Sequence, residues 1–310
     1  MTATLPHAGQ LTVAELIDQY MACYSGRDST RVTRLTWWRD RLGGVTLDEV
    51  TDDQVHEALE ALAGTPPRFF AGKDADGKAI FKAKKALRSP ATVNRYAASI
   101  SAVFTWAVRR RIVPKRWVHP CRGIERRAER NERVRFLNPD ERERLMQACR
   151  TSKWGRLHTL VLMALTTGAR RGELMGLRWR DVDLQHQVAH VGRTKNGDAK
   201  SLPLTAAVIA HMEAIQGPPA AFVFGSDRRA DRPYTFQQRW YEAVKLAKLR
   251  DVTFHTLRHT CASYLAQSGA SLVEIGDLLG HRDLKMTRRY AHLDVSHRAR
   301  LVNRVLGDLR

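Results

Sequence analysis

Three short segments of the sequence carry residues of the kinds that act on phosphate esters. They are Thr-Gly-Ala-Arg-Arg-Gly-Glu at 167–173, His-Thr-Leu-Arg-His-Thr at 255–260, and 280–293, which ends in Arg-Arg-Tyr-Ala-His-Leu. Cutting and rejoining a phosphodiester without a metal needs cations for the phosphorane, a nucleophile that holds the phosphate covalently, and a proton donor for the departing sugar oxygen. The three segments and the hairpin between the first two offer candidates for each part.

Arg170 and Arg258 are the candidate phosphate ligands, because a guanidinium grips two phosphate oxygens with one planar fork. They are far apart in the sequence, so only folding can bring them together. Glu173 lies three residues after Arg170, and we expect it to pair with that arginine or a neighbouring cation and to position it. The alternatives are plain surface charges for the arginines and a helix-surface ion pair for Glu173.

Two lysines flank a predicted hairpin turn and are candidates to protonate the leaving oxygen. Lys195 stands directly before Asn196-Gly197, a strong hairpin signal, and Lys200 follows on the other arm. Surrounding positive charge lowers the pKa of a lysine toward neutrality, which suits a proton donor. The residues alone leave the choice between the two lysines open.

Tyr290 is the candidate nucleophile, and histidines that precede it in the chain are candidates to assist. Its phenol must lose a proton to a base, or be stabilised by cations, before it attacks. His255 and His281 are candidates to donate to phosphate oxygens or to relay a proton, whereas we interpret His259 as a packing or helix-supporting residue. Core packing with a satisfied hydroxyl is the alternative for Tyr290.

A helical zinc site is the competing interpretation of the histidines. His255 and His259 have the spacing of two zinc ligands on one helix face, with Cys261 nearby. Thr256 stands where a metalloprotease has its glutamate, and no third ligand follows at a characteristic spacing. The sequence therefore disfavours a metal.

The composition points to a polyanionic partner. The 310 residues include 52 Lys and Arg against 32 Asp and Glu, a formal charge of +20, and nucleic acid is the first candidate for such a charge. No apolar run approaches 18 residues, and residues 1–10 lack the pattern of a signal peptide, so we expect a soluble, cytoplasmic protein with no membrane partner. The four cysteines are scattered, which favours reduced thiols.

The pattern along the first part predicts helices. Capping signals at Thr12 and Thr51 open two of them, residues 31–42 form a third, and Ser89-Pro90 opens a long amphipathic helix. Residues 64–88 hold prolines, glycines and then several cations, and we expect a loop with a basic end that touches DNA phosphates. We place an N-terminal domain at 1–113 and a basic linker at 114–136, with a solvated connector as the alternative for the linker.

The second part, 137–310, is predicted to be a separate domain of mixed structure. Asn138-Pro139 begins a helix, helical patterns run to Thr167, and Gly168 ends them. A short β section follows at 188–192 and 200–204, and helices return from about Thr235. Apolar residues at helical spacing fill the C-terminal tail: Leu301, Val302, Val305, Leu306 and Leu309.

The three segments, in this order, resemble the boxes of the tyrosine recombinases, or phage integrases. The resemblance implies a mainly α fold with a small β-sheet: an N-terminal helical core-type DNA-binding (SAM-like) domain and a C-terminal α+β catalytic domain, together clamping double-stranded DNA. It implies the catalytic set Arg170, Lys195, His255, Arg258, His281 and Tyr290, with Glu173 in support. Family position favours Lys195 over Lys200.

The resemblance also implies a site-specific recombinase or integrase of a mobile element, working through a 3′-phosphotyrosyl link and a Holliday junction. The partners it implies are a homo-tetramer on DNA and accessory DNA-bending or directionality factors, with no metal and no other cofactor. The tail would dock on a neighbouring protomer, or else pack on its own domain. Residues 1–10 are too short for a separate arm-binding domain, so we expect no arm-site binding.

Two other functions fit parts of the pattern. A relaxing topoisomerase of type IB uses the same chemistry as a monomer without sequence preference. A non-catalytic DNA-binding protein could keep the fold, but it needs basic patches and no tyrosine among them.

Overall fold

Capped helices build the first part of the chain, as the sequence predicts. Helix α1 (Val13–Ala22) and helix α3 (Asp52–Gly64) begin with complete capping boxes at Thr12 and Thr51. Ser89 caps helix α4 (Pro90–Arg109), whose first residue is proline, and helix α2 (Arg31–Leu42) has the predicted bounds. Each cap satisfies backbone amides that have no partner within the helix, so the capped helices begin at defined residues.

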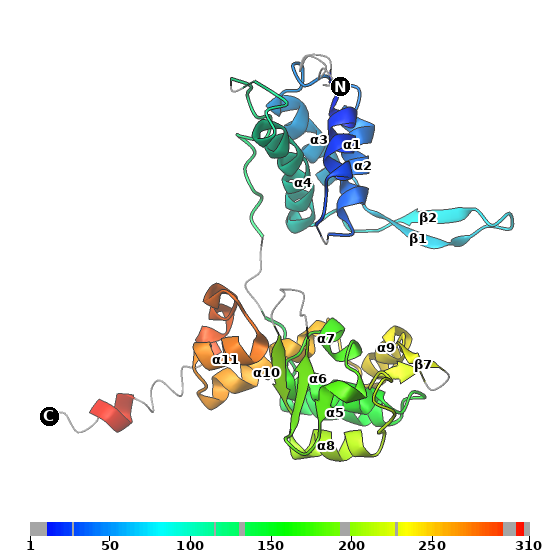
Figure 1. Ribbon diagram of the computed structural model, residues 1–310, viewed down its shortest axis with the longest axis vertical. Helices are drawn as coiled ribbons and strands as arrows, with labels where there is room; N and C mark the ends of the chain where they lie inside the picture. Colours follow the sequence, from blue (N-terminus) through cyan, green and yellow to red (C-terminus); the bar gives the residue numbers. More distant parts are fainter. Residues whose placement is uncertain are drawn as a thin grey trace. The chain divides into compact units, whose positions relative to one another are not determined.

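The computed structural model describes residues 11–26, 28–114, 116–129, 134–192, 199–226, 229–293 and 302–306. The chain divides into two units, Met1–Arg130 and Asn131–Arg310, so the division falls inside the predicted linker 114–136 (Figure 1). Part of that segment packs on the core of the first unit through Trp117, Cys121 and Ile124. The exact domain bounds remain a prediction.

The first unit has its own apolar core, made by the inward faces of its helices. Trp38 and Phe104 are fully buried in it, together with Leu16, Leu62 and Ile100. Burying residues of this size removes a large apolar area from water and holds the four helices together.

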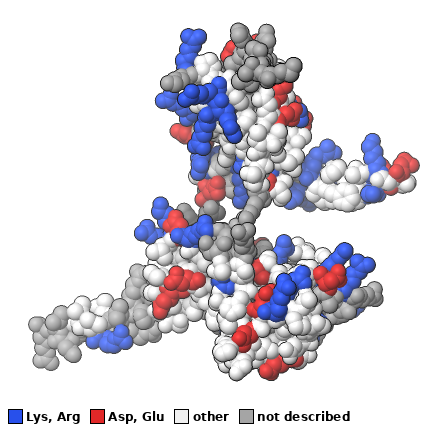
Figure 2. All heavy atoms as spheres, in the orientation of Figure 1, with Lys and Arg blue, Asp and Glu red and all other residues white. Residues whose placement is uncertain are grey.

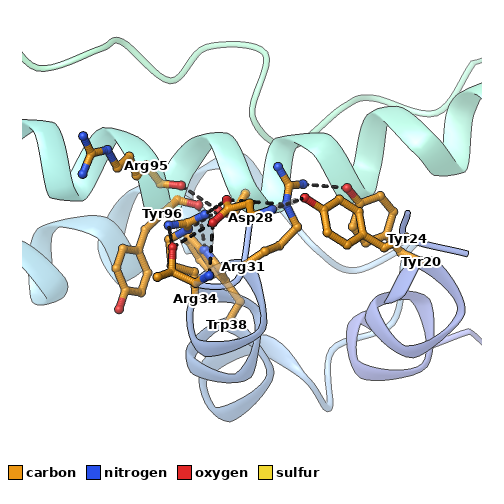
Figure 3. Close-up of polar contacts among 10 residues, drawn as sticks. Tyr20, Tyr24, Asp28, Arg31, Arg34, Trp38, Arg95 and Tyr96 are labelled. Atoms are coloured by element: carbon orange, nitrogen blue, oxygen red, sulfur yellow. Dashed lines mark hydrogen bonds and ion pairs between the residues drawn. The ribbon is translucent and has the colours of Figure 1, made fainter. Parts of the chain in front are cut away.

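Polar contacts fix helix α2 against α1 and α4 at the edge of this core (Figure 3). Arg34 donates from Nε to Ser99 Oγ on α4 at 2.7 Å and pairs with Asp28, while Arg31 donates from Nη1 to Tyr20 Oη on α1 at 2.6 Å. These arginines therefore serve the structure, because each donates a hydrogen bond to a neighbouring helix of the unit.

A two-stranded hairpin corrects the loop expected at 64–88. Strand β1 (Arg68–Lys73) pairs antiparallel with β2 (Ala79–Ala83), with a bulge between Phe70 and Gly72. The turn residues and cations suggested a loop, but aromatic and β-branched residues at 69, 70, 80 and 81 favour strands. The hairpin projects from the helices of its unit (Figure 1).

The second unit is mainly helical, with two small sheets. Its helices are α5 (Pro139–Arg150), α6 (Leu157–Thr167), α7 (Arg171–Met175), α8 (Ala206–Glu213), α9 (Gln237–Leu246), α10 (Phe254–Ser268) and α11 (Leu272–Leu279), with 3₁₀ segments η2 (Trp179–Asp181), η3 (Leu284–Met286) and η4 (Arg288–Leu293). The start of α5 and the end of α6 agree with the sequence-based predictions.

The predicted β section lies in a three-stranded antiparallel sheet of β3 (Val182–Asp183), β4 (Val188–Val191) and β5 (Lys200–Pro203). Val191 pairs with Lys200, which sets the start of β5 opposite the end of β4. The turn between them, with Lys195, lies outside the described residues. A second hairpin, β6 (Gly225–Ser226) and β7 (Arg229–Pro233), was not predicted.

A large apolar core holds the second unit, with helix α6 at its centre. Leu157, Leu160, Val161 and Met163 of α6 are all fully buried. A helix that is apolar on most of its surface must be covered on most sides, and α6 is packed by α5, α8 and α10. Among the residues described, no helix has the length and apolar character needed to cross a membrane.

Candidate active site

Arg170 and Glu173 lie at the turn after α6. Gly168 ends that helix at φ +60°, and a Cβ there would stand 2.4 Å from Leu279 Cδ2. The chain then turns into α7, where Glu173 accepts hydrogen bonds from the Arg170 backbone amide (2.9 Å) and from its Nη1 (2.8 Å). The buried carboxylate therefore binds both the backbone and the guanidinium of Arg170, the pairing that the spacing predicted, and its role in positioning Arg170 for catalysis stays a prediction.

Arg258 reaches the same turn from helix α10. Only 4% of it is exposed, and Nη1 donates to the carbonyl of Gly168 at 2.8 Å. Its buried Nη2 has no hydrogen-bond partner among the described residues. Burial and, next, the charge of Arg170 lower the pKa of Arg258 to about 10, so it stays charged at neutral pH. One arm of the fork is anchored and the other is available to a ligand.

Lys200 is the lysine that the described structure brings to this cluster. Its side chain is 8% exposed, and Nζ lies 3.9 Å from Glu173 Oε2 without a hydrogen-bond partner among the described residues. Burial lowers the pKa of Lys200 to about 8, and the charges of Arg258 and Arg170 act in the same direction against that of Glu173. An amine in this state can give up a proton near neutral pH. Lys195, the other candidate, lies outside the described residues.

Three histidines lie on or next to helices α10 and α11. His255 and His259 stand one turn apart at the start of α10, with ring centroids 4.7 Å apart. His281 follows Gly280, which ends α11 at φ +68°, and its Nδ1 lies 2.8 Å from Thr287 Oγ1. Burial, followed by neighbouring positive charges, lowers the pKa of His255 and His281, that of His281 to about 4. Burial and then His255 lower the pKa of His259 to about 4.

Tyr290 lies inside the fold, on the 3₁₀ segment η4. It is 1% exposed and packs with Ala262 and Ala266 of α10 and with Ile275 and Leu279 of α11. Burial raises the pKa of the phenol, although Arg289 and Arg258 act to lower it. The tyrosine is therefore a neutral phenol at neutral pH in this structure.

The Tyr290 hydroxyl lies 2.7 Å from Nδ1 of His259. This contact was missed by the interpretation of His259 as a packing residue. The signal was present in the sequence, since His259 stands one helical turn after His255 and next to Arg258. With a pKa near 4 the imidazole is neutral, so one ring nitrogen can accept a hydrogen bond from the phenol.

The arrangement is a cluster of cations near a buried tyrosine. Three buried or half-buried cations, Arg170, Lys200 and Arg258, surround one buried carboxylate, Glu173. The surplus positive charge, together with the open arm of Arg258, suits a phosphate group that carries negative charge.

A sequence comparison decides the family. The model of the phage integrase family matches residues 135–297, more than half of the chain. The chain belongs to the phage integrase family.

The chain is similar to an integrase and to a DNA recombinase. The integrase of Salmonella phage P22 is 26% identical over 301 residues, which cover 89% of this chain and 75% of that protein. A shufflon-specific DNA recombinase of Escherichia coli is 33% identical over 162 residues, covering 52% of this chain and 41% of that recombinase. The family assignment therefore agrees with the resemblance stated from the motifs.

Solved structures confirm the fold of the chain. The Tn1549 transposon integrase in complex with a circular intermediate DNA matches with a TM-score of 0.70 at 19% identity, covering 94% of this chain and 99% of that one. A lambda integrase tetramer bound to a Holliday junction matches with a TM-score of 0.67 at 20% identity, covering 90% and 77%. The predicted mainly α architecture, with an N-terminal helical domain and an α+β catalytic domain, is confirmed.

Proposed function

We propose that this chain is a site-specific DNA recombinase that cleaves and rejoins double-stranded DNA through a covalent 3′-phosphotyrosyl intermediate and a Holliday junction. The observation that carries the proposal is the gathering of Arg170, Lys200 and Arg258 around one turn, with Tyr290 buried among the helices that form it. A phosphate-binding cluster needs no phenol, so the pairing of the two favours covalent catalysis over simple binding.

The arginines bind the scissile phosphate. Arg258 offers Nη2, while Glu173 holds Arg170 in a fixed orientation. Cations that are already in position stabilise the charge that develops on the phosphorane without having to reorganise. His255 and His281, both neutral at pH 7, supply ring N–H groups to the same oxygens.

Tyr290 attacks the phosphorus, and the bond to the 5′ oxygen breaks. The phenol gives its proton to the neutral imidazole of His259, which lies 2.7 Å from the hydroxyl. The departing 5′ oxygen takes a proton from a lysine. Lys195 has the family position, and Lys200 has the buried amine with a pKa near 8. The reverse of these steps, with a 5′ hydroxyl from another strand, rejoins the DNA.

The proposed partners are duplex DNA and further copies of this chain. The lambda integrase structure is a tetramer on a Holliday junction, and we propose the same assembly for this chain. Residues 302–306 form a helical turn with Val302, Val305 and Leu306 at least half exposed, which leaves apolar side chains for a neighbouring protomer. Leu301 and Leu309 lie outside the described residues. Accessory DNA-bending or directionality factors, and a mobile element as carrier, complete the proposal.

The test needs no known target site. The purified protein and its Tyr290→Phe variant are incubated with sheared DNA of the host, non-covalent contacts are removed with detergent, and the DNA that stays attached is sequenced. We expect attached fragments that share one motif, only with Tyr290 intact. Attachment by the phenylalanine variant would refute the nucleophile, and attachment without a shared motif would indicate a topoisomerase.

A further inference from the structure

The β1–β2 hairpin stands apart from the core of its own unit. Every residue from 68 to 87 is exposed except Gly72, which is half-buried. The exposed set includes Phe69, Phe70 and Phe81 at 43 to 56% exposure. A two-stranded hairpin is marginal by itself, and large exposed apolar side chains on such an element indicate a binding surface.

The hairpin is nevertheless held firmly at both ends. At its base the Lys84 amide donates to the Pro67 carbonyl at 2.8 Å, and Arg88 donates to the carbonyls of Leu62 and Thr65 at the end of α3. At its tip the Asp74 carboxylate accepts from the amides of residues 76 (3.1 Å) and 78 (2.7 Å). The strands therefore form a defined ribbon that projects from α3 and α4, not a loose loop.

The pairing register places an aromatic ring and a cation on each face of this ribbon. Phe70 lies opposite Phe81, with ring centroids 6.0 Å apart, and Arg68 and Lys73 alternate onto the same face. Phe69 lies opposite Lys82 on the other face. Both faces could therefore make apolar contacts while neighbouring cations meet negative charge.

The charge of the ribbon identifies the partner. Residues 68–85 carry six cations, namely Arg68, Lys73, Lys78, Lys82, Lys84 and Lys85, against two acids, Asp74 and Asp76. Lysines and arginines lie along the hairpin in the space-filling view (Figure 2). Surfaces that bind protein are depleted in lysine at their centres, whereas surfaces that bind DNA are strongly basic.

We propose that the β1–β2 hairpin is a second DNA-binding element, which enters the major groove of the duplex bound by the catalytic machinery. A two-stranded ribbon fits the major groove, its lysines reach the phosphates on either side, and phenylalanine makes apolar contact with thymine methyl groups. The inference rests on the proposed function only in taking duplex DNA as the substrate.

The decisive measurement is the salt dependence of binding to a mixed-sequence 40-base-pair duplex. Removing one cation that binds a phosphate makes the slope of log K against log salt less steep by about 0.9. The triple variant Lys73→Gln, Lys82→Gln, Lys85→Gln should therefore lower the slope by about 2 to 3. The matched control is Lys153→Gln, Lys245→Gln, Lys248→Gln, which removes the same charge from exposed positions of the second unit.

A fall in slope confined to the hairpin variant supports the proposal. Equal falls in both variants would mean that net charge alone matters, and an unchanged slope in the hairpin variant would also overturn the proposal. Asp76→Asn should change the salt slope in the opposite direction, because it removes an acid at the tip and leaves the Asp74 turn intact. It should steepen the slope slightly, and a shallower slope would contradict a DNA contact at this tip.

Excision of residues 68–83 tests the ribbon as a whole. Pro67 and Lys84 are already hydrogen-bonded neighbours, so two glycines can join them without stretching α3 or α4. We expect hydroxyl-radical protection to shrink by several base pairs and Tyr290-dependent attachment to persist at saturating protein. Unchanged protection with fewer protomers on the DNA would assign the hairpin to protein contacts and reject the DNA contact. Loss of attachment in the intact chain would instead count against the proposed function.

Discussion

The active-site cluster and the hairpin use the same residue types in opposite environments. Arg258 and Lys200 are buried beside a carboxylate, and burial lowers the pKa of both. Lys73 and Lys82 are exposed on a projecting ribbon. The two proposals assign different tasks to these cations, because the buried ones would act at one phosphate whose position is fixed, whereas the exposed ones would act additively along a DNA backbone.

The difference should be visible in their response to salt. Charges at the surface are screened within a Debye length of about 8 Å at physiological ionic strength, and buried ones much less. The affinity for DNA should therefore depend on the hairpin and on salt together. The rate of DNA cleavage within the bound complex should depend on the buried cluster and only weakly on salt.

The largest effect is expected from Arg258→Lys. An ammonium carries all its donors on one nitrogen, so it cannot reproduce the fork that holds the Gly168 carbonyl with Nη1 and offers Nη2 to the phosphate, and the cleavage rate should fall about 10²- to 10³-fold. Single-turnover cleavage at saturating protein measures it, and the salt slope of binding should stay within about one unit of the parent. A slope that falls by 2 or more would remove the distinction between the two regions.

The next effect separates the two lysines. If Lys200 protonates the leaving oxygen, Lys200→Met should slow cleavage about 10²-fold or more, and Lys195→Met should have a smaller effect. A substrate with a 5′-bridging sulfur needs no proton for its leaving group, and it should restore the rate of the variant that lacks the acid. Restoration of Lys195→Met alone would assign the acid to Lys195.

The pH profile of cleavage tests independently whether Lys200 protonates the leaving oxygen. The protonated amine is the active form, so with a pKa near 8 the rate should be level below pH 8 and fall about tenfold per unit above it. The falling limb should be absent from Lys200→Met. A fall in rate above pH 8 that persists in Lys200→Met would belong to the titration of another group.

The lowered pKa of Lys200 also predicts a change in stability. The unfolded chain holds this proton up to about pH 10.5 and the folded chain only up to about 8, so the free energy of unfolding should rise between these values, by up to about 3 kcal/mol. Denaturant unfolding of the parent and of Lys200→Met across this window measures the difference. Parallel curves for the two proteins would show that the amine is not buried in solution.

The sequence was sufficient for residues whose role depends on local spacing. Glu173 pairs with Arg170 because they are three residues apart at the start of a helix, and Gly168 and Gly280 end helices as a glycine at that position does. The contacts that assemble the site are of another kind. Lys200 reaches Glu173 through the pairing of β4 with β5, and His259 meets Tyr290 across 31 residues. Spacing places His259 one helical turn after His255 and so near the candidate site, but it does not give the distance from His259 to Tyr290 or from Lys200 to Glu173.

The β1–β2 hairpin shows a different limit of prediction from the sequence. Residues 64–88 were expected to form a loop because glycine, proline and cations are frequent there. This expectation holds for the turn at 74–77, which the Asp74 carboxylate closes. The strands on either side are exposed on both faces, so they lack the alternation of apolar and polar residues that marks a half-buried strand. An element that packs on no core leaves no such pattern in the sequence.

The smallest effects should come from a pair of glycines, one in each region. Gly168→Ala forces an alanine to φ +60° and brings its Cβ to 2.4 Å from a buried leucine side chain, so we expect a loss of about 2 kcal/mol or more of unfolding free energy. Gly77, at φ +79° in the hairpin turn, has nothing within 4 Å of such a Cβ. Gly77→Ala strains only the turn, and because the ribbon supports no core, global unfolding should change by less than about 0.5 kcal/mol. Chemical denaturation of both variants measures this, and a comparable loss at both sites would mean that the hairpin and the helical core unfold together.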